Sequence, residues 1–199
     1  MSAVSQMVLA AFGSVSETAA TWNPSDKDAS VTLSNGDRDA AVTDGSFSAV
    51  RANVGRSSGK RYFEISLPTV PGSARHGFGN GSFSLATYVG NSATSIGIAN
   101  VSQTNSGYTI VNGVSPGAES ASDYYMFAID FATGKAWVGK NGTWYNSGNP
   151  AAGTNEWISG VTGAVYPATS GYTNGSARIH GNSSNFNTSP PSGFSAWGA

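Results

Sequence analysis

The sequence predicts an all-β protein, an antiparallel β-sandwich or barrel, from two observations. Apolar residues recur at every second position in several short segments, which is the period of a strand with two different faces. Short strands separated by frequent turns are typical of a sandwich or a barrel. The turn signals here are Asn-Gly pairs beginning at Asn35, Asn80, Asn112, Asn141 and Asn174, with Asp44-Gly45 in addition.

The clearest hairpin lies at 126–146. Phe127, Ile129 and Phe131 form one face of its first strand, and the residues between them form the other. A return strand follows and is closed by Asn141-Gly142. This dipeptide is a strong hairpin signal because both residues tolerate the positive φ of a two-residue turn.

The same pattern predicts the other strands. Phe63, Ile65 and Leu67 occupy one face of their segment, so we expect antiparallel pairing with one face on the core. The length of 199 residues predicts a single domain. We expect a sandwich at 22–199, preceded by an arm or short helix at 1–21. The expected strands are 30–33, 48–54, 61–67, 76–79, 95–98, 107–111, 125–131, 136–140, 166–170 and 176–180.

Composition excludes several classes of function. Charged residues make up 11% of the chain, against about 25% in an average soluble protein, and the formal net charge is −1. We therefore expect no nucleic-acid partner. The absence of cysteine excludes disulfides and thiol catalysis. No apolar stretch approaches the ~20 residues of a membrane span, so we expect no membrane insertion, and the short N-terminal apolar run lacks the basic region of a signal peptide.

The acidic residues do not indicate catalysis, and we expect neither enzymatic activity nor a cofactor. Glycosidases hold two carboxylates across the scissile bond. The only close pairs here are Asp26 with Asp28 and Asp37 with Asp39, both near the N-terminal edge of the domain. A basic residue separates the acids of each pair, and the remaining ligands of a calcium loop are missing, so we assign no metal.

The two histidines, His76 and His180, lie far apart in the sequence and near no nucleophile-elbow pattern. Such a pair is also a weak metal signal. We expect both to be hydrogen-bonded structural side chains.

Several motifs resemble those of one protein family. The hairpin D-F-A-T-G-K-A-W-V-G-K-N-G-T-W at 130–144 resembles the core hairpin of SPRY-type β-sandwich domains. Its extension W-Y-N-S-G-N-P-A-A-G-T-N at 144–155 is similar to the version found in bacteriophage tail and virion proteins. Further similar motifs are G-K-R-Y-F-E-I at 59–65, H-G-F-G at 76–79, Y-P-A at 166–168 and P-P-S-G-F at 190–194.

The resemblance implies an antiparallel two-sheet β-sandwich, a SPRY-like, concanavalin-like jelly roll, on a bacteriophage tail or capsid surface. Two functions remain open. One is a tail or fibre module that attaches to the host surface by recognising glycan; the other is a structural protein that decorates the capsid or tail and binds other virion proteins. Either role favours a homo-oligomer or many copies on the virion. The resemblance also implies binding through loops at one edge of the sandwich, here 88–91, 115–123, 141–155 and 171–175.

Aromatic residues at expected strand ends and loops are the candidate binding residues. They can stack on sugar rings or act as hot spots for a protein partner, or they can cap the core instead. Trp137 lies mid-strand in the hairpin and is expected near the core. The candidates are Tyr88, Tyr124, Tyr125, Trp144, Tyr145, Trp157 and Tyr172.

The N-terminal arm is apolar enough to need a partner. Val4, Met7 and Val8 fall on one face of a short helix, and Phe12 follows them. Two partners remain open for this arm: a neighbouring subunit or virion protein, and the arm's own sandwich.

Overall fold

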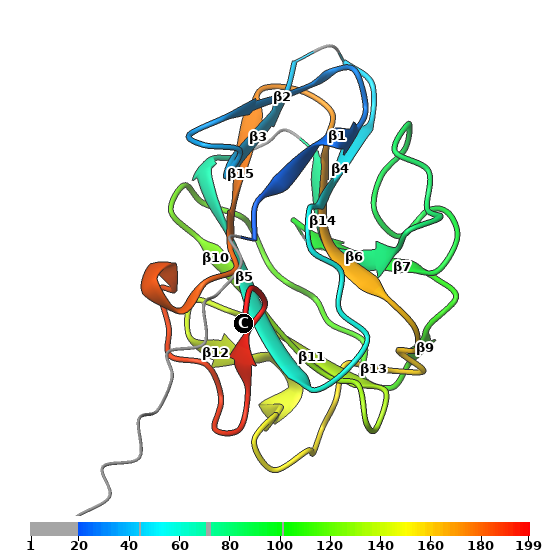
Figure 1. The fold of residues 1–199 in the computed structure, drawn as a ribbon, viewed down its shortest axis with the longest axis vertical. Helices are drawn as coiled ribbons and strands as arrows, with labels where there is room; N and C mark the ends of the chain where they lie inside the picture. Colours follow the sequence, from blue (N-terminus) through cyan, green and yellow to red (C-terminus); the bar gives the residue numbers. More distant parts are fainter. Residues whose placement is uncertain (1–19, 44, 71–72, 101) are drawn as a thin grey trace, which may run out of the picture.

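The computed structural model describes residues 20–199 except 44, 71–72 and 101. The predicted arm, with Val4, Met7, Val8 and Phe12, therefore lies outside the described residues. The described chain forms two β-sheets that face each other (Figure 1), and its helical content is two short 3-10 turns, η1 (Tyr145–Ser147) and η2 (Ser183–Asn185). This confirms the predicted all-β, two-sheet sandwich.

Strand pairing is antiparallel throughout the two sheets, apart from one short parallel pair between β16 and β5. The six-stranded sheet has the order β1 (Trp22–Lys27), β4 (Ser48–Ala52), β14 (Val165–Gly171), β6 (Ala74–Asn80), β7 (Ser95–Ala99) and β8 (Ser102–Ser106). The ten-stranded sheet has the order β2 (Val31–Ser34), β3 (Asp39–Val42), β15 (Gly175–His180), β5 (Lys60–Thr69), β10 (Tyr124–Asp130), β11 (Lys135–Lys140), β13 (Ile158–Ser159) and β9 (Thr109–Ile110), with β12 (Thr143–Trp144) beside β11 and β16 (Ser195–Ala196) beside β5.

The predicted hairpin is confirmed as β10 and β11, whose register runs from Tyr125 opposite Lys140 to Asp130 opposite Lys135. At the next reversal, Asn141 and Gly142 have φ values of 51° and 84°. These left-handed conformations are those that a two-residue hairpin turn requires. Local sequence therefore determines this part of the fold.

The main core lies between the two sheets and is rich in aromatic rings. Phe63 of β5 and Phe127 of β10 stack with ring centroids 4.8 Å apart. Trp197 meets Phe63 edge-on at 5.1 Å, and Phe78 of β6 packs against Phe127 from the opposite sheet. All four side chains are fully buried, so this cluster holds the sheets together.

The expected core face of β5, with Phe63, Ile65 and Leu67, is confirmed. The other faces of β5 and β10 are also buried, because the C-terminal segment folds across the outer face of the ten-stranded sheet. A second core forms there from Tyr62, Met126, Ala128, Trp137 and Phe194. Trp137 is 1% exposed, which confirms its predicted place near the core. The C-terminal segment is thus an integral layer of the domain.

Glu64 fixes that segment to β5. Its carboxylate is fully buried and accepts hydrogen bonds from the Tyr62 hydroxyl at 2.6 Å, the Asn187 backbone N–H at 2.7 Å and the Thr188 backbone N–H at 2.9 Å. The Asn187 side-chain amide donates a further bond at 2.8 Å. Four donors therefore satisfy a buried carboxylate that has no ion-pair partner among the described residues.

Candidate binding surface

The strand registers place several loops at one end of the sandwich. β4 begins, β14 ends and β6 begins side by side, because Ser48 and Ala74 both pair with Gly171. At the other end of β4, Ala52 pairs with Trp22, near the start of the described chain. Figure 1 shows the β14–β15 loop at the top and the C-terminus well below it. We call the first of these ends the loop end.

Three aromatic side chains and one arginine meet at the loop end. The Phe47 ring lies 5.0 Å from Tyr88 and 5.1 Å from Tyr172, measured between centroids. The Arg75 guanidinium carbon lies 5.6 Å from the centre of the Tyr88 ring. Tyr172 is 40% exposed, whereas the other three side chains are half-buried. We call these four residues the aromatic patch.

Strand pairing and one hydroxyl position the aromatic patch. Phe47 and Tyr172 flank the paired residues Ser48 and Gly171, so pairing brings the two rings together. Tyr88 precedes Val89, whose backbone N–H donates to Ser170 Oγ at 3.1 Å. The patch is therefore assembled from segments that lie far apart in the sequence.

A second group of loops packs beside β10 and β11. Lys140 Nζ lies 2.8 Å from Asp123 Oδ2 and donates to the Ala118 carbonyl at 2.6 Å. The Tyr145 hydroxyl donates to the Pro116 carbonyl at 3.0 Å. These contacts join the predicted loop 115–123 to the loop that starts at Asn141.

The structure separates the seven candidate aromatics into three sets. Tyr88 and Tyr172 meet in the aromatic patch. Tyr124, Trp144 and Tyr145 are half-buried and packed against the cores.

The burial of Tyr125 and Trp157 contradicts the binding role proposed for them. They are 0% and 2% exposed. Tyr125 shares the inward face of β10 with Phe127, and the Trp157 indole N–H donates to Gln103 Oε1 at 2.7 Å. Both belong to the main core. Phe47 and Arg75, in contrast, were not among the sequence candidates.

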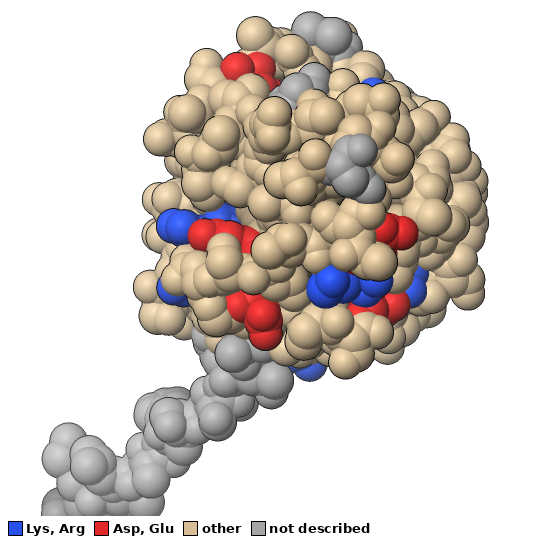
Figure 2. Space-filling model, turned by 90° about the horizontal axis from the view of Figure 1, so that it is seen from above, with Lys and Arg blue, Asp and Glu red and all other residues tan. Residues whose placement is uncertain are grey.

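The surface around the loop end is poor in charge. Figure 2 shows the molecule from above, with acidic and basic side chains in small mixed groups and uncharged residues over most of the surface. Hydrogen bonds and ring contacts are therefore the main interactions that this face offers.

A small cavity opens between the sheets near the loop end. Its interior space is about 20 Å³, and small side chains such as Val42, Ala74 and Ala177 line it. That space holds about one water molecule, whereas ligand pockets usually measure about 300–1,000 Å³, so the cavity is far smaller than a typical small-molecule site. His76 also lines it, fully buried, with Nδ1 2.9 Å from Thr169 Oγ1. Burial lowers the pKa of His76 to about 3, so the imidazole is neutral at physiological pH.

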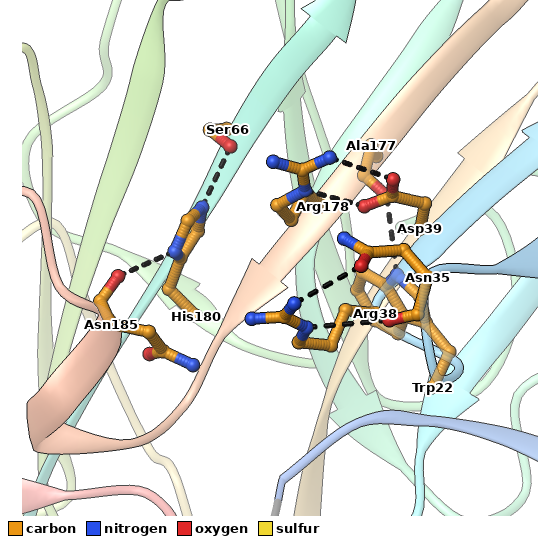
Figure 3. A network of polar contacts seen from close by, with 9 residues as sticks. All are labelled: Trp22, Asn35, Arg38, Asp39, Ser66, Ala177, Arg178, His180 and Asn185. Carbon is orange, nitrogen blue, oxygen red and sulfur yellow. Dashed lines mark hydrogen bonds and ion pairs between the residues drawn. The ribbon is translucent and has the colours of Figure 1, made fainter.

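His180 connects strands and the C-terminal segment. Its Nδ1 donates to the Asn185 carbonyl at 2.6 Å, and its Nε2 lies 2.7 Å from Ser66 Oγ, as Figure 3 shows. In the same view, Arg178 holds Asp39 through two hydrogen bonds of 2.6 and 2.8 Å. Both predicted histidines are hydrogen-bonded within the fold, as expected, and one acid of the 37/39 pair is held in an ion pair.

Buried tyrosines predict a loss of stability at alkaline pH. Burial raises the pKa of Tyr62 and Tyr125 well above the usual value, and the neighbouring Glu64 and Glu119 add to this. Below the unfolded pKa of about 10 both states are protonated, so the free energy of unfolding is unaffected by these groups there. Above it, each tyrosine lowers that free energy by up to about 1.4 kcal/mol per pH unit. Urea unfolding between about pH 8 and about pH 11.5 measures this slope. Tyr125→Phe should flatten it, and an unchanged slope in that variant would contradict the assignment.

Two further features of the described residues bear on function. No three His, Cys, Asp or Glu side chains among them gather as a metal site would require. Within the same part of the chain, no helix is long and apolar enough to cross a membrane.

The two antiparallel sheets define a β-sandwich. Comparison with known proteins shows which kind of β-sandwich the chain resembles. No protein-family model and no curated protein matches the chain. Among solved structures, the SPRY domain of human HERC1 matches with a TM-score of 0.59 and 13% identity, over 79% of this chain and 96% of that one. The TRIM65 PSpry domain matches with a TM-score of 0.58 and 11% identity, over 81% and 91% of the two chains. A human SPRY domain matches with a TM-score of 0.53 and 15% identity, over 76% and 94%.

The chain therefore has a SPRY-like β-sandwich fold. At 11–15% identity, this likeness shows the fold alone. The function depends on the residues at the surface of this chain.

Proposed function

We propose that this chain is a non-enzymatic binding module of a bacteriophage virion, which attaches a tail or fibre to glycan on the host surface. The observation that carries the proposal is the aromatic patch on a charge-poor loop end. Exposed rings such as Tyr172 present an apolar face for a sugar ring and a hydroxyl for hydrogen bonding. The virion context rests on the sequence motifs that resemble bacteriophage tail and virion proteins.

The position of both ends of the described residues, away from the aromatic patch, supports a tethered binding module. The described chain starts near the pair Trp22 and Ala52, at the far end of β4 from the aromatic patch. The C-terminal strand β16 pairs with Arg61 and Tyr62, near the start of β5. A module held at that end presents its loop end outward. Many copies held in this way on one virion would bind a repetitive surface with avidity.

The acidic side chains support a role without catalysis. Within the described residues, five of them form ion pairs with lysine or arginine, including Asp26 with Arg51 at 2.6 Å and Asp123 with Lys140 at 2.8 Å. Glu64 is buried and satisfied by its four donors. A hydrolase would need two carboxylates facing a substrate across a cleft.

Binding of fluorescently labelled protein to a panel of bacterial strains tests this function. We expect the protein to label at least one strain, and the labelling to disappear when surface polysaccharide is stripped. Labelling that survives stripping would exclude glycan as the receptor. Absence of labelling on every plausible host would contradict host attachment.

Tyr172→Ala is expected to reduce cell labelling by about 10-fold or more, because hot-spot aromatics commonly contribute about 2 kcal/mol or more to binding. The free energy of unfolding should change by about 0.5 kcal/mol or less, because the side chain is 40% exposed. Ile110→Ala is the matched control, since Ile110 is 41% exposed but lies on β9, outside the aromatic patch. Equal labelling by both variants would contradict a binding role for the patch.

The alternative function is a structural protein that decorates the capsid or tail and binds other virion proteins. The side chains of Ile110 and Val111 favour it, because they are 41% and 46% exposed at the end of β9, the last strand of the ten-stranded sheet. The apolar sequence at 4–12 is consistent with the same role. This alternative predicts tight binding to a capsid or tail protein that is lost when the first ~20 residues are removed, since apolar contacts supply most of such binding energy.

A further inference from the structure

Among the described arginines, Arg75 is the one with a buried guanidinium nitrogen that has no hydrogen-bond partner. Its Nη1 donates to the Ala74 carbonyl at 2.8 Å, while its Nε is buried with no hydrogen-bond partner. No described carboxylate lies within ion-pair distance of it. In contrast, Arg51 and Arg178 each hold an aspartate through two hydrogen bonds. Arg75 is therefore a cation that has no anionic partner within the described fold.

The Arg75 guanidinium is also held in place. Its Cζ lies over the Tyr88 ring, 5.6 Å from the ring centre, and β6 fixes its backbone between β14 and β7. Gly97 opposite leaves space for it, since a Cβ at that position would lie 3.1 Å from Arg75 Cβ. A guanidinium stacked on an aromatic ring loses little further freedom when it binds a planar anion.

One acid lies in the neighbourhood without pairing to Arg75. Glu119 is close enough to interact electrostatically with Arg75, but its carboxylate accepts a hydrogen bond from the Tyr125 hydroxyl at 3.0 Å. Burial raises the pKa of Glu119, which favours its neutral form. Glu119 is thus a weaker competitor for Arg75 than an exposed carboxylate would be.

We propose that Arg75 binds the carboxylate of an acidic sugar while the sugar ring packs on Tyr172 and Phe47. This inference rests on the proposed function and specifies its ligand as a glycan that contains uronic acid or a similar carboxylated sugar. A carboxylate matches the paired N–H donors of a guanidinium. The Tyr88 ring lies beside that guanidinium, Phe47 packs on Tyr88, and Tyr172 packs on Phe47. An acidic peptide would satisfy Arg75 but would leave the stacking surface unused.

The experiment uses surface polysaccharide extracted from a strain that the protein labels, both in its native form and after chemical reduction of its carboxyl groups to primary alcohols. Reduction removes the charge and leaves the sugar rings. We expect the full chain to bind the reduced polysaccharide at least about 10-fold more weakly, the size of effect that loss of one charge-assisted contact produces. Arg75→Gln should weaken binding to the native polysaccharide by a similar factor and bind both forms equally. Arg75→Lys should retain only part of the native affinity, because lysine lacks the paired donors.

Arg38→Gln is the matched control, because Arg38 is hydrogen-bonded to Asn35 rather than placed in the aromatic patch. Thermal unfolding of each variant shows whether it is folded. Equal binding of native and reduced polysaccharide by the wild-type chain would overturn the assignment of Arg75 while leaving glycan attachment intact. Binding to poly-glutamate as tight as to the native polysaccharide would overturn it in favour of an acidic peptide. If no strain is labelled, the proposed function and this inference both fail.

Discussion

Replacing Glu64 by alanine is expected to lower the free energy of unfolding by about 4 kcal/mol, because it leaves several buried donors without an acceptor. The carboxylate is 0% exposed and binds the Tyr62 hydroxyl and the backbone N–H groups of Asn187 and Thr188. Alanine also frees the C-terminal segment that covers the second core. Urea unfolding measures the loss, and amide exchange at 187 and 188 should accelerate.

Two comparisons make the Glu64 result specific. Glu64→Gln keeps one oxygen acceptor and should lose about half as much stability. Glu156→Ala removes a carboxylate paired with Lys135 at 3.2 Å near the surface, and should cost less than about 1 kcal/mol. A loss below about 1 kcal/mol for Glu64→Ala would show that the C-terminal segment is held by other contacts.

Trp197→Ala is expected to have a similarly large effect, about 3–5 kcal/mol. The indole is fully buried and lies 5.1 Å from Phe63 and 6.3 Å from Phe131 between ring centroids. Its N–H donates to the Val54 carbonyl at 2.8 Å, and Arg56 Nε donates to the Trp197 carbonyl at 2.7 Å. The mutation therefore opens a cavity and leaves the Val54 carbonyl without the indole N–H that donates to it.

Trp197→Phe separates these two contributions. It keeps a ring against Phe63 but removes the hydrogen bond to Val54, so the loss should be about 1–2 kcal/mol. Equilibrium unfolding in urea, analysed with one m-value for all variants, gives the free energies of unfolding to be compared. If Trp197→Ala proved as stable as the wild type, the C-terminal strand would not be part of the core.

Local sequence patterns predicted the central hairpin because its determinants are contiguous. The alternation of Phe127 and Ile129 and the left-handed pair Asn141-Gly142 need no distant partner. The same signal did not hold everywhere. Asn80 also precedes a glycine, but its backbone does not adopt a positive φ. Its side-chain oxygen instead accepts a hydrogen bond from the Ser82 backbone N–H.

Several strands carried no hydrophobic signal. β8 is Ser102–Ser106, with only polar side chains, and it forms the edge of the six-stranded sheet. β1 contains Pro24 and polar neighbours. The expected strand at 107–111 is reduced to Thr109–Ile110. β1 and β8 are edge strands, which need little apolar surface, so alternation did not reveal these two.

The binding surface was predictable only in part. Tyr88 and Tyr172 lie at loop positions that the sequence indicated, but Tyr125 shares a strand face with Phe127, so the period of two already placed it inside. Phe47 and Arg75 join the patch through pairing of β4, β14 and β6, which are far apart in the chain. Such long-range registers are not contained in any local pattern.

The position of the binding surface is tested most directly by an NMR titration of the full chain with oligosaccharide cut from the polysaccharide of a labelled strain. We expect amide shifts to change mainly at 45–47, 73–75, 87–91 and 171–175, which flank the aromatic patch. Little change is expected around Trp22 and Ala52, at the other end of the sandwich. Shifts confined to that opposite end, or to the exposed strip at Ile110 and Val111, would contradict the loop end as the site of attachment.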